Sequence, residues 1–157
     1  MARKGMLIMF GFKSNKEQKI NEKIDEINKI INEQTLSDCY ENNVEAMRKL
    51  FDDNDTFIER SVENRYDSSL KFHLFYTQGL VKDTNINENI IKPLMISDFE
   101  SENNEDIIDT LLKVIVMVSD AKTSSSIKDI ITSICYGNTV ILTRGTDKAL
   151  ILDTKSF

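Results

Sequence analysis

The sequence predicts an α/β fold, in which a mixed β-sheet of about five strands has helices packed against it and an N-terminal amphipathic helix before it. Two observations lead to this prediction. Apolar residues recur with helical spacing in several segments, and short apolar or alternating runs lie between those segments. Because strands and helices are interleaved, at least one pair of strands should be joined by a right-handed crossover.

The composition is that of a globular protein without a basic surface. The chain has 157 residues, of which 40% are hydrophobic and 29% are charged, and its formal net charge is -6. This length is usual for one domain, and we expect a flexible segment over residues 1–14 followed by a single α/β domain over residues 15–157. A negative charge does not favour phosphate contacts, so we expect no nucleic-acid partner.

An amphipathic helix is predicted over residues 15–34. Ser14 and Glu17 form a capping box, and four isoleucines follow at spacings of four, three and four residues: Ile20, Ile24, Ile27 and Ile31. This stripe fits either a helix packed on its own domain or a short coiled coil with a partner chain. Because the stripe spans fewer than about three heptads, it favours packing on the same domain.

The remaining elements follow from capping residues and from apolar periodicity. Helices are predicted from Ser37 to Phe51, from Asn85 to an interruption or end near Pro93, from Glu105 to Leu112 and from Ser126 to just before Gly137. Strands are predicted over residues 56–62, 70–77, 114–118, 139–143 and 148–153. The second strand should be central, and the continuous apolar run at 114–118 should lie inside the sheet.

Four residues have structural roles that follow from the backbone conformations of glycine and proline. Gly79 should let the chain turn after a strand, and Gly145 should turn a β-hairpin. Gly137 should end a helix with a positive φ, whereas Pro93 should stop one. None of these residues carries reactive chemistry.

The sequence contains no recognisable catalytic or cofactor-binding pattern. His73 is the single histidine, and we expect it to be structural or at the surface. The five glycines form neither a dinucleotide-binding motif nor a P-loop, and Cys39 and Cys135 are too far apart for a CxxC motif. The two cysteines are expected to be reduced core residues. We therefore expect no catalytic residue, cofactor or metal.

The longest early apolar run, Met6 to Phe10, is too short to span a bilayer or to serve as a signal peptide. No membrane-spanning segment is expected within this chain.

Four blocks, in this order, closely resemble a known family. They are Leu74 to Val81, Ile86 to Met95, Gly137 to Leu142 and Lys148 to Lys155, with a looser match from Leu36 to Arg60. Together they are similar to the first half of the N-terminal region of the A subunit of bacterial spore germinant receptors, the GerA family. Lys82 departs from the family pattern, in which an acidic residue is expected.

The resemblance implies a non-enzymatic domain that contributes to nutrient sensing and receptor assembly during spore germination. It implies B and C subunits and the rest of the A subunit as partners, a small nutrient bound at most weakly, and a place on the cytoplasmic side of the spore inner membrane. Family members continue into a second subdomain, which makes Lys155 and Phe157 candidate interdomain contacts.

Two other functions compete with this interpretation. The chain could be a stand-alone cytoplasmic interaction module that dimerises through the 15–34 helix. A small-molecule enzyme would have to depend on His73, since no other constellation is present.

Overall fold

A computed structural model describes residues 14–99, 106–115 and 118–157. Contacts within the chain divide it into two compact units, Met1–Gln34 and Thr35–Phe157. The sequence predicted that the α/β domain begins at residue 15. The contacts instead group the helix that begins there with the first unit. That residues 15–157 form one domain remains a prediction.

The first unit contains the expected amphipathic helix, α2 (Asn15–Glu33). Ser14 caps it, because its Oγ accepts a hydrogen bond from the backbone N–H of Glu17 at 3.2 Å. Within the isoleucine stripe, Ile20 is 50% exposed and Ile24 is 48% exposed. The helix and its cap are confirmed.

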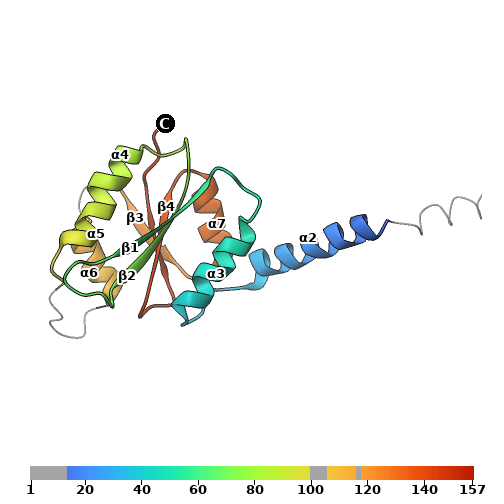
Figure 1. Ribbon diagram of the computed structural model, residues 1–157, viewed down its shortest axis with the longest axis horizontal. Coiled ribbons are helices and arrows are strands. Elements are labelled where there is room, and N and C mark those ends of the chain that lie inside the picture. The colour runs from blue at the N-terminus through green and yellow to red at the C-terminus, as the bar shows by residue number, and fades with distance from the viewer. Residues whose placement is uncertain (1–13, 100–105, 116–117) are drawn as a thin grey trace, which may run out of the picture. The chain divides into compact units, whose positions relative to one another are not determined.

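The second unit is built on a five-stranded sheet of order β1-β2-β4-β5-β3 (Figure 1). The strands are β1 (Phe57–Glu63), β2 (Lys71–Thr77), β3 (Ala121–Ser124), β4 (Thr139–Thr143) and β5 (Ala149–Leu152). In the described part of the chain, all four strand pairings are antiparallel. The strand number and the packed helices are confirmed, but the expectation of a mixed sheet is wrong.

The position of β5 explains why the sheet is not mixed. β3 and β4 are both antiparallel to β5, so they run in the same direction, and helix α7 (Ile127–Cys135) joins them. A crossover between two strands of the same direction is therefore present, and its predicted right-handedness stays a prediction. Because β5 lies between these strands, every neighbouring pair is antiparallel.

Helices cover both faces of the sheet (Figure 1). One face carries α4 (Asp83–Ile86), the π-helical turn η1 (Asn87–Ile91), α5 (Lys92–Ile96) and α6 (Ile107–Val114). The other face carries α3 (Tyr40–Leu50) and α7. Alternate residues of β2 point to opposite faces, so Phe72 and Leu74 lie in the core under α4–α6, whereas Phe75 lies under α3 and α7. All three side chains are fully buried, and β2 pairs with β1 and β4, so it is an inner strand as expected, although β4 is the middle strand of the sheet.

The strand predicted over residues 114–118 is wrong where the structure describes it. Helix α6 continues through Val114, and Ile115 follows it outside any strand, while residues 116–117 lie outside the described residues. Ile115, directly after the end of this helix, is only 4% exposed and belongs to the main core cluster, so burial of this apolar residue does not require a strand. The third strand instead starts at Ala121, at the sheet edge, where mostly exposed polar residues suffice.

Pro93 does not end the helix, so that part of the prediction is wrong, but the helical pattern is interrupted just before it, which is the predicted alternative. The helical segment runs from Asp83 through Pro93 to Ile96, and its turn widens into a π-helix just before the proline. The Lys92 N–H bonds to the carbonyl of Asn87, five residues earlier. A widened turn gives room for the proline ring, whose missing N–H would otherwise break the ladder.

Several local predictions are displaced. Helix α3 starts at Tyr40 rather than after a Ser37 cap, and α4 starts at Asp83 rather than at Asn85. The Ser37 Oγ accepts the N–H of Cys39 instead, which makes a local turn ahead of the helix. Cys39 and Cys135 are both exposed, so their assignment to the core is also wrong.

Candidate functional site

Three of the residues selected from the sequence are positive-φ glycines. Gly79 has a φ of +88° in the turn after β2, and Gly145 has a φ of +85° in the turn between β4 and β5. Gly137 has a φ of +92° directly after the end of α7. These values confirm the predicted cap and turns. None of the three supplies a reactive group.

The structure brings Gly137 together with both candidate contact residues. A Cβ on Gly137 would lie 3.3 Å from Lys155 Cγ and 3.3 Å from Phe157 Cε1, so both side chains pass close over the glycine. Lys155 forms a β-bridge with Val81, and the Phe157 side chain is 80% exposed. The interdomain role of the two residues stays a prediction.

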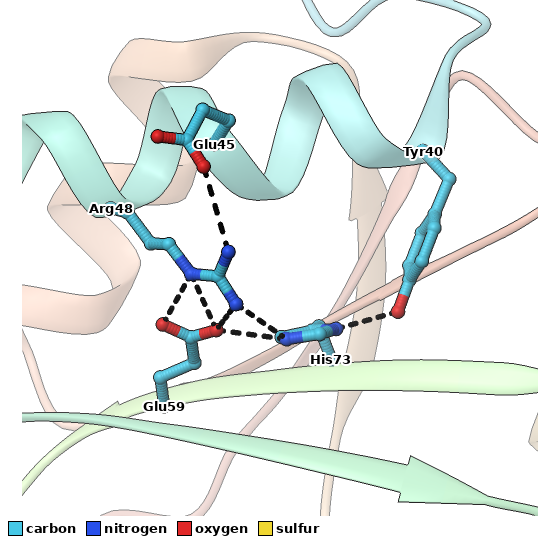
Figure 2. A network of polar contacts seen from close by, with 5 residues as sticks. All are labelled: Tyr40, Glu45, Arg48, Glu59 and His73. Atoms are coloured by element: carbon cyan, nitrogen blue, oxygen red, sulfur yellow. Dashed lines mark hydrogen bonds and ion pairs between the residues drawn. The ribbon is translucent and has the colours of Figure 1, made fainter.

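The most extensive polar cluster centres on His73, which is 9% exposed (Figure 2). Its Nδ1 lies 2.6 Å from the Tyr40 hydroxyl, and its Nε2 lies 2.8 Å from Glu59 Oε1. The Arg48 Nε donates to both Glu59 oxygens, at 2.8 and 2.9 Å. Glu45 lies on the outer side of the same guanidinium, at 3.5 Å. The cluster thus joins α3 to β1 and β2.

The partners of His73 decide which ring nitrogen carries the proton. A carboxylate only accepts hydrogen bonds, so the Nε2 facing Glu59 carries a proton and donates it. The Nδ1 of the neutral ring then accepts from the Tyr40 hydroxyl. Arg48 Nη2 lies 3.5 Å from Nε2, but both are donors, so each is directed to the carboxylate rather than to the other.

Burial and charge set the protonation of the cluster. Burial lowers the pKa of His73 below its usual value, against the opposing effect of Glu59. Burial also raises the pKa of Tyr40, which keeps the phenol a donor. The hydrogen bonds from Arg48 lower the pKa of Glu59. At neutral pH the cluster therefore contains an Arg48 guanidinium paired with both Glu59 and Glu45, and an uncharged imidazole.

This arrangement fits a structural tie better than a reaction centre. Both nitrogens of His73 are occupied by neighbouring side chains, and neither a serine nor a cysteine is among its hydrogen-bond partners. The sequence predicted that His73 is structural or at the surface. It did not predict that Tyr40, Arg48 or Glu59 are its neighbours, since nothing in the local sequence places them around the ring.

The cluster predicts a loss of stability in mild acid. Burial lowers the pKa of His73 in the folded protein below the 6.5 that is usual for histidine, so the unfolded chain binds this proton more readily. Stability should therefore fall as the pH drops through 6.5 toward the lower pKa of the folded protein. Urea unfolding at neutral pH and in mild acid measures this, and His73→Gln should reduce the difference.

Tyr40→Phe is the matched control, because it removes the hydrogen bond at Nδ1 but leaves the imidazole to titrate. It should lower stability at both pH values and keep the pH dependence. An equal pH dependence in the wild type and in His73→Gln would contradict the assignment.

A shallow groove of about 340 Å³ lies between α6, β3 and the β4–β5 hairpin. Asp106 and Asp109 line it at the start of α6. Lys122 lines it from β3, and Lys148 lines it from the turn between β4 and β5. Over residues 14–99, 106–115 and 118–157, no three His, Cys, Asp or Glu side chains gather to bind a metal ion. Nor is any helix in those ranges both long and apolar enough to cross a membrane.

Comparison with solved structures supports the fold. The chain is similar to the N-terminal domain of the A subunit of the Bacillus megaterium spore germinant receptor GerK3, with a TM-score of 0.67 and 17% sequence identity. The match covers 79% of this chain and 49% of that chain, so this chain spans about half the length of its relative. No curated protein sequence matches it.

The family model of the Bacillus/Clostridium GerA spore germination protein matches residues 45–157. This range contains the whole sheet and every helix of the second unit, apart from the first residues of α3. The resemblance seen in the four sequence blocks is therefore confirmed. The chain belongs to the GerA spore germination protein family.

Proposed function

We propose that this chain is part of the N-terminal region of a germinant-receptor A subunit and acts there without catalysis, in nutrient sensing and receptor assembly. The observation that carries the proposal is the family match over residues 45–157, which covers the whole five-stranded sheet and the helices on both of its faces, apart from the first residues of α3. The occupied nitrogens of His73 support a role without catalysis.

The proposed partners are the B and C subunits and the rest of the A subunit, at the cytoplasmic side of the spore inner membrane. A small nutrient would bind this unit only weakly, because the groove beside α6 is open and lined by charges of both signs. We propose no cofactor and no nucleic-acid partner, in keeping with the net charge of -6.

The test uses spores that carry the intact gene, an in-frame deletion of residues 45–157, or the deletion together with a restored copy. The deletion should abolish the germination response to at least one nutrient, and the restored copy should return it. Unchanged germination with every nutrient, in spores without a second receptor of this family, would overturn the proposal.

The intact gene provides an independent check. It should encode a second hydrophilic stretch and membrane-spanning segments after Phe157. A gene without them would remove the assignment to an A subunit while leaving the family membership in place.

A second candidate function is self-association through α2, which the exposed Ile20 and Ile24 favour. This role predicts a concentration-dependent dimer in sedimentation experiments that Ile24→Asp, at an exposed position, should abolish. A monomer at every concentration would exclude it.

A further inference from the structure

Basic residues are concentrated in the first part of the sequence. Residues 1–23 contain six Lys or Arg and two Glu, which gives a formal net charge of +4. The other 134 residues contain 14 Lys or Arg and 24 Asp or Glu, which gives -10. A charge division of this kind indicates that the basic segment contacts a negatively charged partner. The family match begins at residue 45, so it assigns no role to residues 1–23.

Helix α2 places part of this positive charge beside its isoleucine stripe. Lys16, Lys19 and Lys23 recur at spacings of three and four residues, so they line one side of α2 in its first half. Lys16 lies four residues before Ile20 and Lys23 lies three residues after it, which makes both of them neighbours of this isoleucine on the helix surface. All four side chains are exposed. A row of lysines therefore borders the exposed part of the stripe.

Most acidic residues of α2 lie on the opposite side of the helix. At about 100° per residue, Glu22, Asp25, Glu26 and Glu33 all fall more than about 120° from the middle of the stripe, and only Glu17 lies close to it. Nine of the 19 residues are charged. A helix with one apolar side, bordered by lysines, and a charged opposite side is the kind that lies along a bilayer surface.

The sequence before α2 has the same two components. Residues 6–12 are Met, Leu, Ile, Met, Phe, Gly and Phe, and Arg3, Lys4 and Lys13 flank them. Such a composition binds anionic bilayers, because the apolar side chains enter the hydrocarbon while the cations meet the lipid headgroups. Residues 1–13 lie outside the described residues, and only their composition supports the contact.

The charges beside the stripe fit a bilayer better than a second copy of the helix. In a coiled coil, the positions next to the apolar seam usually carry opposite charges that pair across it. On α2 these positions are Lys16 and Lys23 on one side and Asn21 and Asn28 on the other. Two parallel helices would bring lysine to asparagine, and two antiparallel helices would bring lysine to lysine. Neither arrangement gains an ion pair.

We propose that α2 docks on the surface of an anionic lipid bilayer through Ile20, Ile24 and the row of lysines. The two isoleucines are 50% and 48% exposed, and they face the hydrocarbon in the docked helix while the lysines reach the headgroups. The residues before α2 strengthen the contact by their apolar and basic side chains. This contact does not rest on the proposed function, which is argued from residues 45–157.

Co-sedimentation of the 157-residue chain with lipid vesicles tests the proposal. The chain should bind vesicles of equal parts phosphatidylglycerol and phosphatidylcholine, and bind pure phosphatidylcholine weakly. Binding should weaken as salt is added, because salt screens the charges. Lys16→Gln and Lys19→Gln should each weaken binding to the anionic vesicles about fivefold, since each removes one positive charge near the surface. Glutamine is also a good helix former, so α2 should stay helical in both variants.

Lys29→Gln is the matched control, because Lys29 is an exposed lysine on the side of α2 opposite the stripe. It should weaken binding less than about twofold. A loss as large as that of Lys16→Gln, or equal binding to the two kinds of vesicle, would overturn the proposal. Absence of binding to both would also overturn it, and a concentration-dependent dimer would then assign the stripe to self-association. None of these results affects the deletion test of residues 45–157.

Discussion

Replacing Asn64 with alanine should lower the free energy of unfolding by about 2–4 kcal/mol. Its side chain is 2% exposed and makes four hydrogen bonds. The Nδ2 donates to the carbonyls of Leu94 and Ser97, each at 2.8 Å. The Oδ1 accepts the backbone N–H groups of Tyr66 and Asp67, at 2.9 and 3.1 Å. Alanine would leave these groups without their partner, and each such buried group costs about 1–3 kcal/mol.

Asn54→Ala is the matched control. The Asn54 Oδ1 also accepts two hydrogen bonds, both from Thr56, but these lie at the surface, where water can replace them. The loss for Asn54→Ala should be below about 1 kcal/mol. Urea unfolding monitored by circular dichroism measures both variants. Similar losses at the two positions would show that Asn64 does not bind the loop after β1 to the end of α5.

The role of Asn64 could not be predicted from the sequence. An asparagine between two strands indicates a turn, and that much is correct. Its hydrogen bonds to Leu94 and Ser97 depend on where α5 ends, which is 30 or more residues away. Local patterns contain no information on such a distance.

The parts that were predicted correctly depend on local chemistry. The β4–β5 hairpin has Gly145 between two apolar runs, and α7 is capped by Ser126, whose Oγ accepts the Asp129 N–H. In both cases the residues that determine the structure are neighbours in the chain. The strand predicted over residues 114–118 and the helix end predicted at Pro93 were wrong, because distant packing overrides local preference there.

The His73 cluster could be predicted only in part. Both strands around it were predicted, but only their register decides the cluster: Ser61 lies opposite His73, and Glu59 lies two residues along on the same face. Arg48 and Tyr40 then come from a helix packed on that face. The sequence therefore indicated only that His73 is structural or at the surface, because its burial and its partners depend on the tertiary structure.

Replacing Gly137 with valine should lower the free energy of unfolding by about 2–5 kcal/mol, for two independent reasons. Its φ of +92° is a conformation that side chains with a Cβ rarely adopt. In addition, the new atoms would meet Leu80, Lys155 and Phe157 within 3.2–3.3 Å. Leu80 and Lys155 are held by backbone pairing around Val81, so they can move apart only if this pairing weakens.

Gly145→Val separates the two reasons. Gly145 has a similar φ of +85°, but a Cβ there would meet nothing within 4 Å. Its loss should therefore reflect backbone strain alone, about 1–2 kcal/mol. Thermal and urea unfolding of both variants give the difference, which measures how tightly the last segment packs over the end of α7. Because that packing supports Phe157, Gly137→Val should also speed hydrogen exchange at the Ser156 amide, whereas Gly145→Val should not. Equal losses of stability in the two variants would show that the last segment can shift away from Gly137 without cost.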